Sequence, residues 1–127
     1  MLKTSLVADR VLAEELLKLS PAEIGIRKDL IKRCIRLKQA VVRKDKFDRG
    51  ERQILNFGHT IGHALESLAM EENRDLYHGE AVANGMYHTL NLSDTLCKYD
   101  IERIQKYIKA SIGNSFNIEQ IYAKFNR

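Results

Sequence analysis

The chain has 127 residues, which is enough for one compact domain and too few for two of ordinary size. Apolar residues make up 44% of the sequence, so we expect a buried core and not a disordered chain. The net charge is only +4, and basic residues alternate with acidic ones without any DNA-reading motif, so we expect no nucleic-acid partner. An anionic small molecule suits this mild positive charge.

No apolar run approaches the roughly 18 residues of a membrane span, and the N-terminus does not resemble a secretory signal. We therefore expect a cytoplasmic protein with no membrane partner. The two cysteines, Cys34 and Cys97, lie in apolar helical patterns without metal-binding spacing. We expect both to be buried thiols in a reducing compartment, with a disulfide as the alternative.

Apolar residues recur at intervals of three and four along almost the whole chain, which predicts helices. The first predicted helix runs from the N-terminus to about Leu19 and bends near Asp9. The second covers about residues 20–45, because Ser20 and Glu23 form a capping box at its start.

Loops and helices alternate in the rest of the chain: a loop over 45–50, a helix over about 59–68, a loop over 70–77, a helix over about 78–99, a helix capped by Asp100 and ending around Gly113, and a short helix over 116–121. The sequence thus predicts an all-α bundle of about six helices, with no linker that would split it.

Three of the four histidines are candidates for a metal site. His59 and His63 are four residues apart, so they share one helix face and could bind one ion. His78 opens the next predicted helix, and an antiparallel return would bring it back toward His59. A pair of histidines without metal is the alternative. A zinc protease is disfavoured because Thr60 stands where that motif needs glutamate, and His88 among apolar neighbours is expected to be structural.

Cations and an amide accompany the histidines. Arg52 and Asn56 lie four residues apart just before His59, and Lys3 and Lys38 lie on earlier predicted helices. Such a set suits a substrate that carries a carboxylate and a phosphate. A solvated basic face is the alternative for any one of them, and Lys38 could also extend from the apolar face of its helix to water.

The segment from Asp45 to Glu66, with its central run Leu55-Asn56-Phe57-Gly58-His59-Thr60-Ile61-Gly62-His63, resembles the signature of 3-dehydroquinate synthases. The run from Tyr77 to Met86 is similar to the next signature block of that family. Met1–Asp9 resembles the helix that carries the family's first metal ligand. The resemblance extends over nearly the whole chain, to about Gly113, and implies that residues 1–127 form the C-terminal helical domain.

The resemblance implies a homodimeric lyase with an NAD-binding α/β domain, a helical C-terminal domain and an active site between them. Such an enzyme converts 3-deoxy-D-arabino-heptulosonate 7-phosphate to 3-dehydroquinate and phosphate in the shikimate pathway, which leads to aromatic amino acids. NAD⁺ transiently oxidises a substrate hydroxyl, phosphate is eliminated, and an aldol closure forms the ring. Zn²⁺, or Co²⁺ in its place, binds and polarises substrate hydroxyls.

The same resemblance implies the roles of individual residues. His59 and His78 would be metal ligands, which differs from the His59–His63 pair that spacing alone suggests, and His63 would face the substrate's phosphate. The residues that it implies for the anionic ends and hydroxyls of the substrate are Lys3, Lys38, Arg52 and Asn56.

The family's metal ligand on that first helix, a glutamate that acts together with the two histidines, would fall just before Met1, and the family's later lysine segment has no match after Ile118. The resemblance thus implies that the NAD-binding domain is absent from this chain. We expect this polypeptide alone not to turn over substrate, and to self-associate or to pair with an NAD-binding half. The alternatives are another sugar-phosphate cyclase, acting on sedoheptulose 7-phosphate or glucose 6-phosphate, and a non-catalytic helical module.

Overall fold

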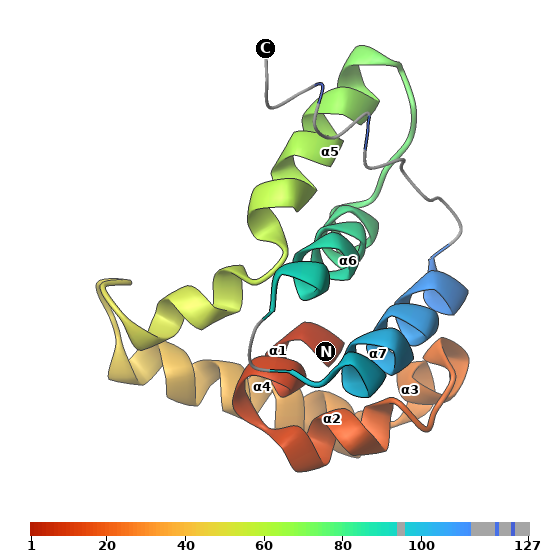
Figure 1. Cartoon of the computed structure of the whole chain (residues 1–127). Helices are drawn as coiled ribbons and strands as arrows, with labels where there is room; N and C mark the ends of the chain where they lie inside the picture. The colour runs from red at the N-terminus through yellow and green to blue at the C-terminus, as the bar shows by residue number, and fades with distance from the viewer. Residues whose placement is uncertain (94–95, 113–118, 120–122, 124–127) are drawn as a thin grey trace. The chain divides into compact units, whose positions relative to one another are not determined.

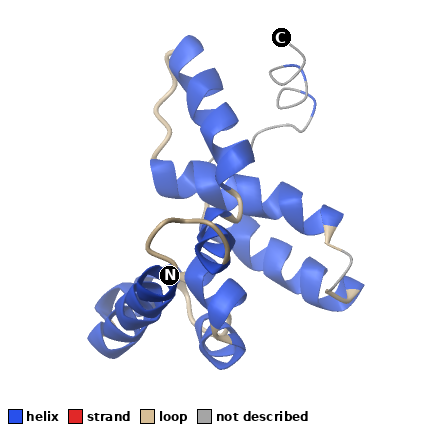
Figure 2. Cartoon of the chain, turned by 90° about the vertical axis from the view of Figure 1, so that its left-hand side faces the viewer, coloured by secondary structure: helices blue, strands red, loops and turns tan. Residues whose placement is uncertain are grey.

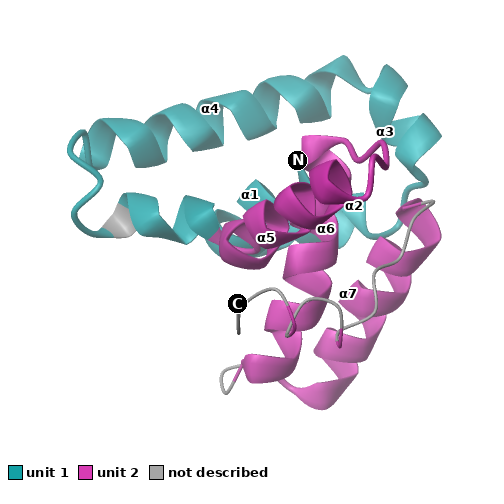
Figure 3. Ribbon diagram, turned by 90° about the horizontal axis from the view of Figure 1, so that it is seen from above, with its two compact units in different colours: residues 1–56 teal, residues 57–127 magenta. Residues whose placement is uncertain are grey.

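A computed structural model describes residues 1–93, 96–112, 119 and 123. This part of the chain forms seven α-helices and two short 3-10 helices and contains no strand, so the predicted all-α class is confirmed (Figures 1 and 2). The chain divides into two compact units, residues 1–56 and residues 57–127, which are called unit 1 and unit 2 (Figure 3).

Unit 1 contains five helices: α1 Leu2–Ala8, α2 Arg10–Leu16, α3 Pro21–Ile26, α4 Lys28–Lys44 and the 3-10 helix η1 Glu51–Asn56. The predicted bend near Asp9 is confirmed as a break between α1 and α2. Asp9 is extended, with φ −153° and ψ 93°, and its carboxylate accepts the Leu12 N–H at 2.9 Å. Asp9 therefore ends one helix and caps the next.

The helix predicted from Ser20 onwards is interrupted at Arg27, so the prediction of one continuous helix is wrong. Its start is as expected, since the Glu23 N–H donates to Ser20 Oγ and the Ser20 N–H donates to Glu23 Oε2. Arg27 leaves the helical conformation at φ −88° and ψ 84°. Its guanidinium donates two hydrogen bonds to Asp29, at 2.9 and 2.7 Å, which favour the break.

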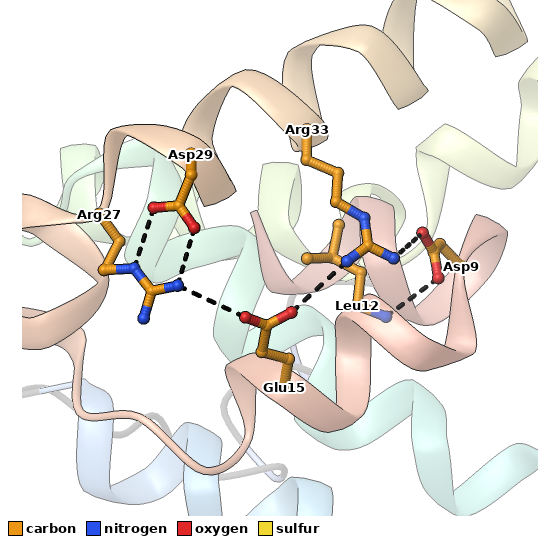
Figure 4. A network of polar contacts seen from close by, with 6 residues as sticks. All are labelled: Asp9, Leu12, Glu15, Arg27, Asp29 and Arg33. Atoms are coloured by element: carbon orange, nitrogen blue, oxygen red, sulfur yellow. Dashed lines mark hydrogen bonds and ion pairs between the residues drawn. The ribbon is translucent and has the colours of Figure 1, made fainter.

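Charged side chains join α2 to the start of α4 (Figure 4). Arg33 lies 2.8 Å from Asp9 and 3.4 Å from Glu15, and Arg27 lies 3.6 Å from Glu15 and 2.7 Å from Asp29. All five side chains are partly exposed, so solvent screens their attraction. The network therefore orients the helices, and the apolar core beneath it supplies most of the stability.

That core consists of Leu12, Leu16, Leu30 and Cys34. Burial raises the pKa of the Cys34 thiol. Both cysteines are free, but Cys97 is exposed, so the prediction that it is buried is wrong. Cys97 occupies the N-cap of α7, and its sulfur lies 3.2 Å from Asp100 Oδ2.

Unit 2 contains α5 His59–Glu71, α6 His78–Thr89, the 3-10 helix η2 Leu90–Leu92 and α7 Lys98–Ser111. The prediction of one helix over 78–99 is therefore wrong, because α6 ends at Thr89, η2 follows it, and α7 begins only at Lys98. Asn91 lies in η2, and its Oδ1 accepts a hydrogen bond from Gln105 Nε2 of α7 at 2.9 Å. Asp100 lies in the first turn of α7 and does not cap it. The predicted Gly113 terminus and the helix predicted over 116–121 lie outside the described residues.

One core cluster of unit 2 lies between α5 and α6 and consists of Leu65, Leu68, Ala69 and Ala81, while Ile104 and Ile108 of α7 are also buried. In the described ranges, no helix has both the length and the apolar character needed to cross a membrane.

Candidate metal centre

Glycines let the backbones of α5 and α6 touch. Gly58, at the N-cap of α5, has φ 79°, a left-handed conformation that favours glycine. A Cβ added to Gly85 would collide with the Gly58 carbonyl oxygen, and one added to Gly62 would lie 3.2 Å from the Ala81 carbonyl oxygen. Because later residues of α5 meet earlier residues of α6, the two helices run antiparallel, as predicted.

This packing brings the three predicted histidines of unit 2 together. The ring centroids lie 5.4 Å apart for His59 and His78, 5.6 Å apart for His59 and His63, and 6.1 Å apart for His63 and His78. His63 and His78 are exposed, and His59 is partly buried. The fourth histidine, His88, makes an edge contact with the Tyr87 ring, 5.2 Å between centroids.

A carboxylate belongs to the same cluster. Glu66 Oε1 lies 2.8 Å from His78 Nδ1, and the ligand atoms of His63, Glu66 and His78 all lie within 4.8 Å of one another. Glu66 ends the segment from Asp45 that resembles a family signature, but it was not among the predicted site residues. Its position three residues after His63 and seven after His59, on one helix face, was the available signal.

The donor atoms of this cluster suit a zinc-type ion. Imidazole nitrogen and carboxylate oxygen are the ligands that zinc takes in catalytic sites, usually three from the protein with one position left open. Cobalt accepts the same donors. The side chains of unit 2 therefore offer donor atoms of the kind that the predicted ion takes, although the three that converge belong to His63, Glu66 and His78 and not to the predicted ligand His59.

The other predicted site residues lie in unit 1. Lys3, on α1, donates from Nζ to the Leu55 carbonyl oxygen of η1 at 2.6 Å. Burial lowers the pKa of Lys3, and the charge of Lys38 lowers it further. Lys38, on α4, and Asn56, at the end of η1, are exposed. Two lysines close enough to repel each other form a local positive potential in this unit.

Arg52 is positioned by the loop before η1. The Asp45 carboxylate accepts the backbone N–H groups of Arg49, Gly50 and Arg52 at 3.0, 2.7 and 3.1 Å. These hydrogen bonds, the one from Arg49 most strongly, lower the pKa of Asp45. The Arg52 guanidinium lies 3.4 Å from the Lys46 carbonyl oxygen. Asp45 thus organises the loop from which Arg52 extends.

The described residues show no comparable fit for a dinucleotide. The sequence has no Gly-x-Gly-x-x-Gly run, and the described ranges contain no strand that could lead into such a loop.

The fold and the cluster define a class, an all-helical domain with a candidate centre for a divalent metal. The sequence matches the family described as 3-dehydroquinate synthase C-terminal over residues 1–126, and the chain belongs to this family. The resemblance carried by the segment from Asp45 to Glu66 is thereby confirmed.

Individual relatives of the chain carry the name of the same family. The chain is 40% identical to a 3-dehydroquinate synthase of Methylacidiphilum infernorum over 110 residues, which cover 86% of this chain and 29% of the relative. It is 51% identical to one of Clostridium acetobutylicum over 95 residues, 72% of this chain and 26% of the relative. It is 40% identical to one of Parabacteroides distasonis over 79 residues, 62% of this chain and 22% of the relative. The chain thus spans between about a fifth and a third of the length of these relatives.

Proposed function

We propose that this chain provides the metal-binding and substrate-binding helical part of a 3-dehydroquinate synthase. The complete enzyme would eliminate phosphate from 3-deoxy-D-arabino-heptulosonate 7-phosphate and close the ring of 3-dehydroquinate. Family membership supports this proposal, and the three relatives described above carry that enzyme's name. Those names favour the synthase over another sugar-phosphate cyclase.

The observation that supports it most is the approach of two histidines from different helices. His59 and His78 are 19 residues apart in sequence, yet their ring centroids lie 5.4 Å apart. We propose both as metal ligands. A bound Zn²⁺ or Co²⁺ ion supplies Lewis-acid chemistry toward substrate hydroxyls.

The remaining predicted residues would bind the anionic groups of the substrate. Exposed His63 would offer an imidazole N–H to the phosphate. Lysine and arginine side chains bind carboxylate and phosphate by charge-assisted hydrogen bonds, and the mutual repulsion of Lys3 and Lys38 would be relieved by an anion. The four residues proposed for this role are Lys3, Lys38, Arg52 and Asn56.

Zinc titration of the purified chain tests the metal centre. The unsubstituted chain should bind one equivalent of zinc. His59→Ala and His78→Ala should each weaken zinc binding by more than about 100-fold. Loss of a residue that only hydrogen-bonds to a metal ligand costs up to about that much, and these two variants each remove a ligand itself. His88→Ala, which removes a histidine of α6 outside the cluster, is the matched control. Equal zinc affinity in all three variants would contradict the proposal.

The substrate class is tested by calorimetry on the zinc-loaded chain. 3-Deoxy-D-arabino-heptulosonate 7-phosphate should bind more tightly than sedoheptulose 7-phosphate, because only the former carries a carboxylate. Arg52→Ala should reduce this preference. Equal binding of the two sugars would instead favour another sugar-phosphate cyclase.

A further inference from the structure

We propose that Glu66 is a positioning residue for His78, holding the ring through Nδ1 so that Nε2 faces the metal. This inference rests on the proposed function, in which His78 is a metal ligand. Its observation is the 2.8 Å contact between Glu66 Oε1 and His78 Nδ1, which joins α5 to α6.

The contact joins Glu66, whose side chain is partly buried, to His78, whose side chain is more exposed. The Glu66 side chain is 30% exposed, whereas the His78 side chain is 58% exposed. His78 is the first residue of α6, and the side chains beside its ring are Glu66 and the imidazoles of His59 and His63. The Glu66 carboxylate, which is more enclosed by protein, therefore restrains the ring.

The backbone that carries Glu66 is held by the core of unit 2. Its neighbour Leu65 is fully buried, and Leu65 packs in one core cluster with Leu68 and Ala69 of α5 and with Ala81 of α6. The same two helices touch at Gly58 and Gly85. Core contacts thus fix the backbone from which the carboxylate extends and the backbone that carries His78.

The hydrogen bond determines which nitrogen of His78 is free. A neutral imidazole has one N–H and one nitrogen with a lone pair. When Nδ1–H donates to Glu66, the lone pair is on Nε2, which can bind an ion without losing that proton. A carboxylate behind a metal-bound imidazole also increases its basicity as a ligand.

The test compares Glu66→Ala with Glu66→Gln, and uses Glu71→Ala, an exposed carboxylate at the end of α5, as the control. Competition with a chromophoric chelator should show zinc affinity about 10- to 100-fold weaker in Glu66→Ala. Glu66→Gln should lose less, because its amide oxygen can still accept the Nδ1–H. The control should bind zinc like the unsubstituted chain.

A second measurement reports the position of the proton without metal. Nitrogen-15 NMR of the metal-free chain, well above the usual histidine pKa of about 6.5, distinguishes the two tautomers. His78 should be the Nδ1–H tautomer in the unsubstituted chain and shift toward Nε2–H in Glu66→Ala. A purely structural role for Glu66 would not change this ratio in a variant whose circular dichroism is unaltered.

The measurements distinguish failure of the proposed function from failure of the role proposed for Glu66. If the unsubstituted chain does not bind zinc, the proposed function fails, while the tautomer still decides what Glu66 does. If Glu66→Ala keeps both the tautomer and the zinc affinity, the positioning role is overturned. If Glu66→Gln loses as much affinity as Glu66→Ala and the visible spectrum of the cobalt form shows a ligand lost, Glu66 binds the ion directly, which also overturns it.

Discussion

Two features of its surroundings change the pKa of Lys3 in the same direction. Its ammonium group is partly buried, donates to the Leu55 carbonyl oxygen at 2.6 Å and lies within the field of Lys38. Both burial and the second lysine lower its pKa. An anion bound beside the two lysines would reverse the second effect.

Removing the charge of Lys38 should therefore raise the pKa of Lys3. Lys38→Gln keeps a polar side chain, one atom shorter, while abolishing the repulsion that favours neutral Lys3. The Nζ and Cε signals of Lys3, followed by NMR during a pH titration, give the value. Lys32→Gln, at another exposed position of α4, is the control. An unchanged Lys3 titration in Lys38→Gln would show that burial alone causes the shift.

At the residue scale, the sequence predicted the three clustered histidines and missed Glu66. Histidines 59 and 63 share a face by spacing, and the loop before His78 permits a return of the chain. The partner of Glu66 is 12 residues away on another helix, so the pairing depends on how α5 packs against α6. Helical period alone does not contain that information.

At the element scale, local signals succeeded where the cause of a boundary is local. The capping box at Ser20 and the break at Asp9 depend on side chains within three residues, and both were predicted. The break at Arg27 also involves Glu15 of α2, which no local pattern reveals. The end of α6 was missed because the apolar period continues through Leu90 and Leu92.

The glycine contact between α5 and α6 predicts a steric mutation. Gly85→Ala places a methyl group against the Gly58 carbonyl oxygen, so the helices must separate. We expect unit 2 to lose about 1–3 kcal/mol of unfolding free energy, as overpacked cores do. Zinc affinity should fall as well, because the histidines would move apart.

The matched control is Gly79→Ala in the same helix, where an added Cβ meets nothing within 4 Å. Chemical denaturation followed by circular dichroism should show this variant unchanged or slightly more stable, since alanine is the better helix former. Equal stability of the two variants would refute the close approach at Gly85.

At the scale of the whole molecule, four of the carboxyl groups that the structure describes in unit 1 have a lowered pKa. Backbone N–H groups stabilise Asp9, Glu23 and Asp45 as carboxylates, with the Leu12, Ser20 and Arg49 N–H groups contributing most to each in turn. Hydrogen bonding from Arg27 lowers the pKa of Asp29 to about 2. These groups make the stability of unit 1 depend on pH in the acid range.

The number of protons bound by the folded and unfolded chain decides how the stability of unit 1 changes with pH. Each folded pKa lies below the unfolded value of about 3.9 for Asp or 4.3 for Glu, so the unfolded chain binds more protons in acid. The stabilisation is complete above about pH 5 and is lost as the pH falls through the folded values, toward about 2 for Asp29.

Amide hydrogen exchange at pH 6 and pH 3 should therefore show protection falling in α2, α3 and the loop at Asp45. Asp45→Asn should reduce this pH dependence around the loop, because one of the titrating groups is gone. Asp48→Asn, an exposed change in the same loop, is the control. A loop whose protection depends on pH equally in both variants would contradict the role of Asp45.

The two thiols divide the molecule chemically. Cys34 packs in a cluster of leucines, and burial raises its pKa, whereas Cys97 is exposed at the N-cap of α7. Alkylating reagents attack the deprotonated, accessible sulfur. A maleimide dye added to the folded chain would thus be attached to unit 2 alone, giving a single-site fluorescent probe without any engineered cysteine.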